Sequence, residues 1–353
     1  MTIYSISLFS KNLRAAVALV FSLFISMGIS WASGPTYVRD AISVSTEWTP
    51  ANSPYLIQND IGVQKGAVLT IDPGVTVQFR TPSNGNTGSG TNLVIQGALK
   101  AVGTYTNPIH FVPASPGSLW GSLYFINADS ANCLLQDCVV KGGSVIFNAC
   151  SPTITQCAIE GSKAGLELLG NSQAQIVGNR ITGNGVGIAF LDEMVSATVT
   201  QNEIDNNNYG IYLKNFLNPV ISRNRIYGNL KYNMVNYSAK PLAAPNNDFH
   251  LTDAQQIMRT VYDGAYNGSY GRLNFIPFIG MAAGQTASPL LANPAVASTQ
   301  KPVIPEDDFF SYGRPFDAMK VCNLNNNKKK SSSAVEILAV GVMSAASIAI
   351  LFL

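Results

Sequence analysis

The stretch from Cys133 to Asn229 repeats one short phrase, and this repeat constrains the fold more than any other feature of the chain. Four copies read PTITQCAIEG from position 152, AQIVGNRITG from 174, ATVTQNEIDN from 197 and PVISRNRIYG from 219. The copies recur about every 22 residues, a period typical of solenoids, in which each repeat buries its apolar face against its neighbours.

Alignment of the copies produces vertical columns of like residues. Apolar residues lie two apart within each copy, which is strand periodicity, and glycine or asparagine marks the corners. The helical period that tetratricopeptide or leucine-rich solenoids require is missing. Two apolar columns enclose a third one: Ile154, Ile176, Val199 and Ile221; Ile159, Ile181, Ile204 and Ile226; and, between them, Cys138, Cys157, Asn179, Asn202 and Asn224.

This pattern predicts a parallel β-helix, in which each coil lies about 4.8 Å above the last, the ordinary interstrand spacing. Identical side chains then stack as aliphatic and asparagine ladders. A stacked asparagine bonds its neighbours and the corner backbone, which allows an amide to replace an apolar group in the interior. Asn179, Asn202 and Asn224 are therefore interpreted as structural.

The chain resembles the right-handed parallel β-helix repeat proteins, a pectate-lyase-like superfamily, in the form found in exported bacterial members. Phrases that carry the resemblance include LTIDPGVTVQF from position 69, LVIQGALKAVG from 93 and WGSLYF from 120. The resemblance covers roughly residues 45–280. It implies an all-β, single-stranded right-handed parallel β-helix with a short helical C-terminal cap. It says little about activity, because one fold serves many chemistries.

The two ends differ from the body. Residues 1–32 have the pattern of a signal peptide, with Lys11 and Arg14 before an apolar run and small residues before a cleavage site after Ala32. An uncleaved anchor is the alternative, and both interpretations predict export. The β-helix domain with its caps is expected over 33–280, after residues 34–49 as a polar approach, with seven or eight coils.

Residues 281–332 are rich in Ala, Pro, Ser and Asn and are predicted to form a disordered stalk. Residues 333–353 are mostly apolar, long enough to span a bilayer, and follow a lysine run at 328–330. Two interpretations are open, a retained anchor and a processed tail. Either one predicts an exported protein attached to a membrane, in the periplasm or at the cell surface.

Five cysteines would enter an oxidising compartment if the chain is exported. Cys138 and Cys157 occupy one column on adjacent coils, and stacked strands bring Cα atoms within disulfide range. A Cys138–Cys157 disulfide and two small buried thiols are both consistent with the pattern.

One outward face gathers charged residues from successive copies. By alternation, Glu203, Asp205, Arg180 and Arg225 share that face. They could form the site of a polysaccharide lyase, epimerase or hydrolase, since such chemistry uses paired carboxylates or a basic side chain. The alternative is a ladder of opposite charges that attract across neighbouring strands, and this interpretation is preferred.

Tyr212 and Tyr227 are predicted to point outward and to offer rings on which a sugar could stack. No residue spacing indicates a metal site or a cofactor. Charged residues make up only 12% of the chain and the net charge is +2, which argues against nucleic acid as a partner. The sequence therefore favours a non-catalytic β-helix protein that binds a polysaccharide or cell-surface glycan, or serves a structural or adhesive role. A carbohydrate-active enzyme is the alternative.

Overall fold

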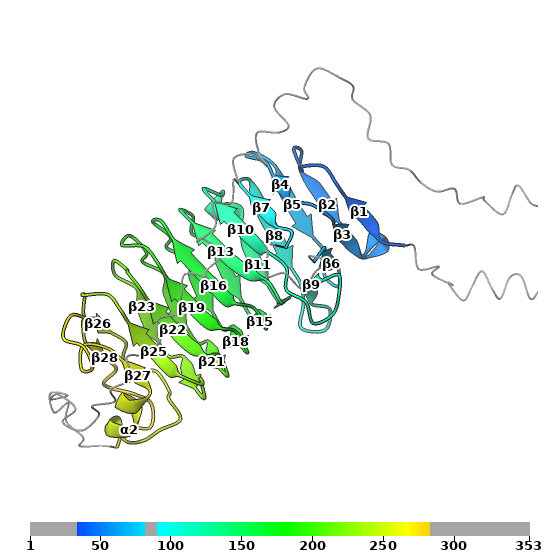
Figure 1. Ribbon diagram of the computed structural model, residues 1–353. Helices are drawn as coiled ribbons and strands as arrows, with labels where there is room; N and C mark the ends of the chain where they lie inside the picture. Colours follow the sequence, from blue (N-terminus) through cyan, green and yellow to red (C-terminus); the bar gives the residue numbers. More distant parts are fainter. Residues whose placement is uncertain (1–33, 82–89, 283–353) are drawn as a thin grey trace, which may run out of the picture.

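The computed structural model describes residues 34–81 and 90–282. These residues form an elongated stack of coils that runs from β1 at one end to α2 at the other (Figure 1). Each regular coil contributes one strand to each of three walls, and each of these strands pairs in parallel with the corresponding strand of the next coil. The fold is therefore a parallel β-helix, as the repeat predicts.

The described residues form three long parallel sheets, here named A, B and C, of nine, nine and eight strands. Sheet A contains β1 (Thr36–Val38), β3 (Tyr55–Ile57), β6 (Thr76–Phe79), β9 (Ile109–Pro113), β12 (Cys138–Lys141), β15 (Ala158–Glu160), β18 (Arg180–Thr182), β21 (Glu203–Asp205) and β24 (Arg225–Tyr227). Sheet B contains β4 (Ile61–Val63), β7 (Leu93–Ile95), β10 (Ser122–Ile126), β13 (Ser144–Asn148), β16 (Ala164–Leu169), β19 (Val186–Phe190), β22 (Tyr209–Leu213), β25 (Tyr232–Asn236) and β27 (Val261–Tyr262). Sheet C contains β2 (Thr46–Trp48), β5 (Val68–Ile71), β8 (Ala98–Val102), β11 (Leu134–Gln136), β14 (Thr153–Thr155), β17 (Gln175–Val177), β20 (Thr198–Thr200) and β23 (Val220–Ser222).

The N-terminal end of the solenoid begins earlier than the sequence predicted. Residues 34–49, expected as a polar approach, contain β1 and β2, and Trp48 of β2 is buried against Tyr55 with ring centroids 4.6 Å apart. The prediction of seven or eight coils is therefore too low, since two sheets hold nine strands each. The repeat is weakest here, because the first coils use mixed aliphatic and aromatic residues in place of one repeated phrase.

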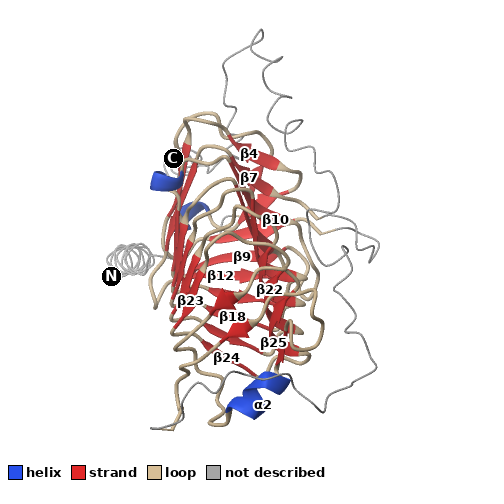
Figure 2. Cartoon of the chain, turned by 90° about the vertical axis from the view of Figure 1, so that its left-hand side faces the viewer, coloured by secondary structure: helices blue, strands red, loops and turns tan. Residues whose placement is uncertain are grey.

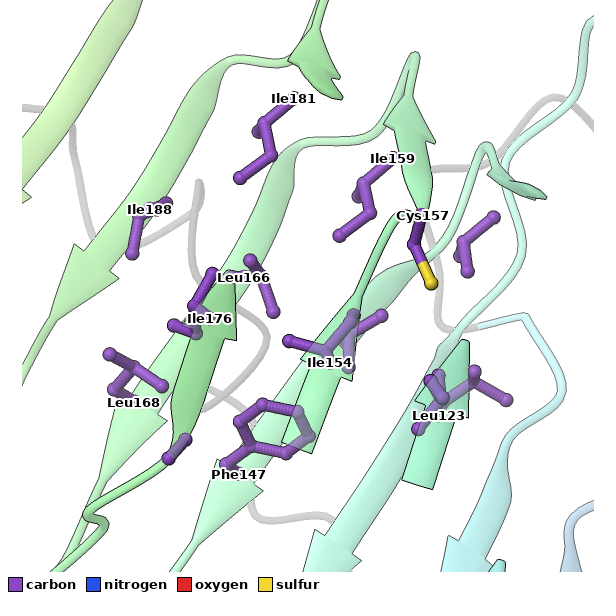
Figure 3. Close-up of a cluster of buried hydrophobic side chains, with 14 of the residues drawn as sticks. Leu123, Phe147, Ile154, Cys157, Ile159, Leu166, Leu168, Ile176, Ile181 and Ile188 are labelled. Atoms are coloured by element: carbon purple, nitrogen blue, oxygen red, sulfur yellow. The ribbon is translucent and has the colours of Figure 1, made fainter. Parts of the chain in front are cut away.

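The interior is a continuous shaft of apolar side chains. Ile159, Ile181, Ile204 and Ile226 are direct register partners on β15, β18, β21 and β24, and each is fully buried. Figure 3 shows Ile159 and Ile181 projecting into the same interior as Leu166 and Ile188 of sheet B. In-register stacking places each branched side chain against a copy of itself, so one packing solution serves every coil.

Asparagine side chains stack at the corner between sheets C and A. The backbone N–H of Asn179 donates to Oδ1 of Asn202 at 2.9 Å, and the N–H of Asn202 donates to Oδ1 of Asn224 at 3.0 Å. Each Nδ2 also donates to the next Oδ1 at 3.0 Å. The ladder continues to Asn247, which accepts from the N–H of Asn224 at 2.9 Å. These amides satisfy corner backbone groups that strand pairing leaves without partners.

A second asparagine ladder lies at the corner between sheets A and B, and the sequence interpretation did not include it. Asn184 donates its N–H to Oδ1 of Asn207 at 2.9 Å, and Asn207 donates likewise to Asn229 at 3.0 Å. Stacked asparagine side chains thus stabilise two of the three corners of each coil.

The C-terminal end is closed by a short cap. Helix α2 (Ala254–Arg259) begins after Asp253, whose side chain accepts from the N–H groups of Gln255 and Gln256. Ile257 and Met258 bury its apolar side against the last coil. The strands β26 (Leu242–Ala243) and β28 (Leu273–Asn274) pair beside it, and 3-10 turns occupy Pro50–Asn52 and Ser130–Asn132. Figure 2 shows α2 at one end of the stack.

The described strands run from Thr36 to Asn274, and the domain bounds 33–280 stay a prediction. Apart from residues 281 and 282, the segments predicted as a signal peptide (1–32), a stalk (281–332) and an anchor or processed tail (333–353) lie outside the described residues. None of the helices formed by the described residues is long and apolar enough to cross a membrane.

Candidate functional site

The charged residues predicted from the sequence come together on the outer surface of sheet A. In β18, β21 and β24 the middle residue is an isoleucine that points into the shaft, so the residues on either side of it point outward. The register places Glu203 between Arg180 and Arg225, and Asp205 between Thr182 and Tyr227. The structure thus brings all four charged candidates, Glu203, Asp205, Arg180 and Arg225, onto one patch.

Opposite charges in the patch form ion pairs. Nη1 of Arg225 lies 3.3 Å from Oε1 of Glu203, and Nη2 of Arg180 lies 3.6 Å from Oδ2 of Asp205. About half of each arginine side chain is exposed. The Arg225–Glu203 pair is open to solvent, and pairs of this kind contribute little to stability, on the order of 0–1 kcal/mol. The geometry is therefore that of a charge ladder, but these surface ion pairs add little to the stability that the packed interior provides.

Tyr227 has its ring fixed by three neighbours. Its hydroxyl donates to Oε1 of Glu203 at 2.6 Å, and its ring stacks on His250 with centroids 3.7 Å apart and planes 17° apart. The guanidinium of Arg225 lies 5.5 Å from the ring centroid. The hydrogen bond to the Glu203 carboxylate, followed by desolvation, raises the pKa of Tyr227, so the phenol stays protonated.

His250 extends the patch by one coil, and the sequence interpretation did not place it there. Its backbone has a positive φ of 55°, and its N–H donates to Oδ1 of Asp248 at 2.8 Å. Nε2 lies 3.5 Å from Oδ2 of Asp248 and accepts a long bond of 3.4 Å from Nε of Arg225. The sequence did carry a signal, because Asn247, Phe249 and His250 match Asn224, Ile226 and Tyr227 in order, and the bridge between Arg225 and Asp248 has this register.

Asp205 is the most enclosed carboxylate of the patch. Only 4% of the residue is exposed. Oδ2 accepts a hydrogen bond from Nδ2 of Asn206 at 2.8 Å in addition to its contact with Arg180, whereas Oδ1 is buried without a hydrogen-bond partner. A buried oxygen without a partner costs free energy and is uncommon in folded proteins, so it needs an explanation.

Tyr212 is not an exposed aromatic, and that part of the sequence interpretation is wrong. Its side chain does leave the shaft, as alternation predicts, but only 2% of the residue is exposed. The ring of Tyr237 packs on it with centroids 5.4 Å apart. Alternation gives the direction of a side chain, but it does not tell whether a later part of the chain covers it. Tyr227 is therefore the one of the two predicted sugar-stacking rings that stays partly exposed.

Cys138 and Cys157 lie on adjacent coils of sheet A and are free thiols in the structure, as are Cys133 and Cys150. All four are buried. Burial raises the pKa of Cys133 to about 11 and that of Cys150 to about 12. The thiol of Cys138 has its pKa raised by its contact with Cys157 and by burial. The Cys138–Cys157 disulfide stays a prediction.

Among residues 34–81 and 90–282, no group of three or more His, Cys, Asp or Glu side chains has the arrangement of a metal site. The patch instead offers three carboxylates, two guanidinium groups, a phenol and an imidazole on four successive coils. Such a set can form directional hydrogen bonds with a polyhydroxylated ligand. It also contains the paired acids that glycoside chemistry uses.

A family model described as a right-handed beta helix region matches residues 123–258. This match covers less than half of the chain, and together with the parallel coils it supports a right-handed parallel β-helix fold.

Among curated proteins, "Protein bark beetle" of Drosophila melanogaster is 49% identical over 59 residues. That stretch is 17% of this chain and 2% of the length of the Drosophila protein. No solved structure matches the chain.

Proposed function

We propose that this protein is a non-catalytic β-helix that binds a glycan through the outer surface of sheet A. The observation that carries the proposal is the Tyr227–His250 pair, a stacked aromatic platform rimmed by Glu203, Arg225 and Asp248. Carbohydrate recognition commonly combines an aromatic surface for the apolar face of a sugar with charged groups for its hydroxyls. A ring held in place by three contacts loses little entropy when a ligand binds.

The contacts within the patch favour binding over catalysis. Glu203 already accepts from Tyr227 at 2.6 Å and pairs with Arg225 at 3.3 Å. A carboxylate that acts as nucleophile or general base needs access to the reacting atom, and these contacts occupy it. The fixed pairs therefore suit a recognition surface whose hydrogen-bonding groups are set before the ligand arrives.

One observation favours the alternative, a carbohydrate-active enzyme that is a lyase, an epimerase or a hydrolase. Oδ1 of Asp205 is buried and has no partner, although the residue lies on an outer wall. A ligand hydroxyl that reached this oxygen would supply the hydrogen bond that it lacks. Glu203 and Asp205 flank Ile204 on one extended strand and point to the same side of it, and paired carboxyl groups are what glycoside chemistry uses.

Binding is tested by probing a glycan array with the full-length protein. Tyr227→Ala is the first variant to be compared with the wild type. Loss of the ring is expected to weaken the affinity for a bound glycan roughly tenfold, as truncation of one central contact residue commonly does. Tyr105→Ala is the matched control, because Tyr105 is 95% exposed and lies in a loop of another coil. Equal binding by both variants would contradict the proposal.

Turnover separates the two functions. Glycans that bind are incubated with the protein, and reducing ends and unsaturated uronates are measured. The binding function predicts no turnover. Turnover that Glu203→Gln or Asp205→Asn abolishes would establish the enzyme instead.

We also propose that the protein is exported and attached to a membrane or cell surface. The support is the sequence of residues 1–32 and 333–353, with the lysine run at 328–330. Fractionation of cells with and without carbonate washing tests attachment, and N-terminal sequencing of the mature protein tests cleavage after Ala32. A protein that stays in the cytoplasmic fraction with its first residues intact would refute this proposal.

A further inference from the structure

Two Asn-Gly dipeptides lie among the described residues, at 184–185 and at 267–268. An asparagine followed by glycine can lose its side-chain amide spontaneously, because glycine has no side chain to shield its backbone nitrogen and leaves the backbone free to turn. The reaction requires that the glycine nitrogen and the departing amide group are not held by other bonds. The structure gives these groups opposite surroundings at the two dipeptides.

The dipeptide at 184–185 is held by hydrogen bonds at both groups. The N–H of Gly185 donates to the carbonyl of Ser162 at 3.0 Å. Nδ2 of Asn184 donates to Oδ1 of Asn207 at 3.0 Å, and Oδ1 of Asn184 accepts from the N–H of Ser162 at 3.0 Å and from its hydroxyl at 2.7 Å. Asn184 is only 2% exposed. Its place in the second asparagine ladder thus holds both the attacking nitrogen and the departing group.

The dipeptide at 267–268 lies in the connection between β27 and β28. Gly268 and Ser269 are exposed, and a Cβ added at Gly268 would meet no atom within 4 Å. Within the part of the chain that the structure describes, no acceptor takes the N–H of Gly268 or Nδ2 of Asn267. The attacking nitrogen and the departing amide group are therefore both open to water.

The side chain of Asn267 is already folded toward the attacking nitrogen. Its Oδ1 accepts a hydrogen bond from the N–H of Ser269 at 3.0 Å. An asparagine oxygen that bonds the N–H two residues further on closes an Asx turn, which brings Cγ toward the nitrogen of the residue between them. The same N–H stabilises the negative charge that develops on Oδ1 as Cγ is attacked.

We propose that Asn267 is a site of spontaneous modification to isoaspartate and aspartate, and that the fold protects Asn184 from the same reaction. The nitrogen of Gly268 forms a bond to Cγ of Asn267 and loses its proton, and the side-chain nitrogen leaves as ammonia. Water then opens the resulting cyclic imide. Attack of water at the main-chain carbonyl carbon of residue 267 gives isoaspartate, whereas attack at Cγ gives aspartate. On either route a water molecule enters and an ammonia molecule leaves.

The modification would alter a turn that positions a tyrosine ring. The N–H of Tyr270 donates to the carbonyl of Asn267 at 3.0 Å, and the N–H of Asn267 donates to the carbonyl of Asp263 at 3.3 Å. The ring of Tyr270 packs edge-on against Tyr237 with centroids 5.1 Å apart. Isoaspartate turns the Asn267 carbonyl into a free carboxylate and adds a carbon to the main chain, so the turn cannot keep this geometry.

Incubation of the full-length protein in mildly alkaline buffer, followed by peptide mass spectrometry, tests the proposal. The mass gain from asparagine to aspartate measures conversion, and electron-transfer fragmentation distinguishes isoaspartate from aspartate. We expect Asn267 to convert at least about tenfold faster than Asn184, because Asn184 reacts only when its coil opens. In urea that unfolds the protein, the two dipeptides should convert at similar rates, since the fold no longer distinguishes them.

Gly268→Ala is the matched variant. The added Cβ meets no atom within 4 Å, so circular dichroism should show an unchanged fold, while the methyl group shields the nitrogen and should slow conversion of Asn267 at least about tenfold. Three results would each overturn the proposal: conversion of Asn267 no faster than that of Asn184 in the folded protein, conversion in Gly268→Ala as fast as in the wild type, or a difference between the dipeptides that persists in urea. The last result would assign the difference to the local sequence instead of the fold.

Discussion

Replacement of Asn202 by alanine isolates the contribution of the asparagine ladder to stability. Asn202 is 1% exposed. Its Oδ1 accepts from the N–H of Asn179 at 2.9 Å, and its Nδ2 donates to the carbonyl of Ile176 at 2.8 Å and to Oδ1 of Asn224 at 3.0 Å. Alanine removes both functional groups at once. The N–H of Asn179 and the carbonyl of Ile176 then lose buried partners, at a cost of about 1–3 kcal/mol each.

We therefore expect Asn202→Ala to lower the free energy of unfolding by about 4 kcal/mol, a large share of the roughly 5–15 kcal/mol that holds a typical domain together. Urea titration followed by circular dichroism measures the loss, with Asn132→Ala as the control. Asn132 is partly exposed, its side-chain Nδ2 donates to Oδ2 of Asp129 at 2.8 Å near the surface, and loss of this amide should cost less than about 0.5 kcal/mol. Equal losses in the two variants would refute the reasoning that interior amides hold the corners.

Three further perturbations test the interior. Ile204→Ala, in the fully buried isoleucine column, should cost about 2–5 kcal/mol by urea titration, whereas Val220→Ala on the exposed side of sheet C should cost less than about 0.5 kcal/mol. Gly187→Ala should destabilise by about 2 kcal/mol or more, because the added Cβ would lie 2.5 Å from the carbonyl oxygen of Gly210. Gly268→Ala, with no atom within 4 Å of the added Cβ, is the neutral comparison. Raising the pH from 9 to 11 should lower the free energy of unfolding, because Cys133 and Cys150 keep protons in the folded state that the unfolded state, with thiol pKa values of 9.0, gives up. The free energy of unfolding should fall by about 1.4 kcal/mol per pH unit for each thiol. Urea titrations across this pH range should give a smaller fall for Cys133→Ala/Cys150→Ala than for the wild type. Equal falls would contradict the assigned pKa values.

The interior of the solenoid could be predicted from the sequence because its rule is local and repeated. Ile181, Ile204 and Ile226 recur at one spacing, and a stack of parallel strands turns equal spacing into direct contact. The second asparagine ladder had the same signal, since Asn184 and Asn207 each lie five residues after a member of the first ladder. It was missed because a corner asparagine is equally well explained by turn chemistry.

The outer surfaces could be predicted only in part, since each strand fixes only which way its side chains point. The outward direction of their side chains was enough to predict that Arg180, Glu203 and Arg225 lie on one patch. The place of His250 over Tyr227 also had a signal, since His250 lies three residues after Asn247 as Tyr227 lies three after Asn224, but the irregular residues before Asn247 concealed it. The direction of a side chain could not show that Tyr212 is covered, which depends on Tyr237 and the chain that follows.

The outward side chains of the three walls differ in their chemistry because the interior side chains suffice to specify the β-helix fold. Isoleucine columns and two amide ladders occupy only inward and corner positions, so outward positions are free to diverge from wall to wall. Sheet A carries paired charges and a partly exposed aromatic stack, whereas sheet B carries a buried apolar surface. A substitution on one wall should therefore leave the other two unchanged, since sites without shared contacts contribute additively. Tyr227→Ala and Ala189→Asp, on different walls and two coils apart, should lower the free energy of unfolding by amounts that add in the double variant. A double variant that departs from the sum of the two would show that the walls communicate through the shaft.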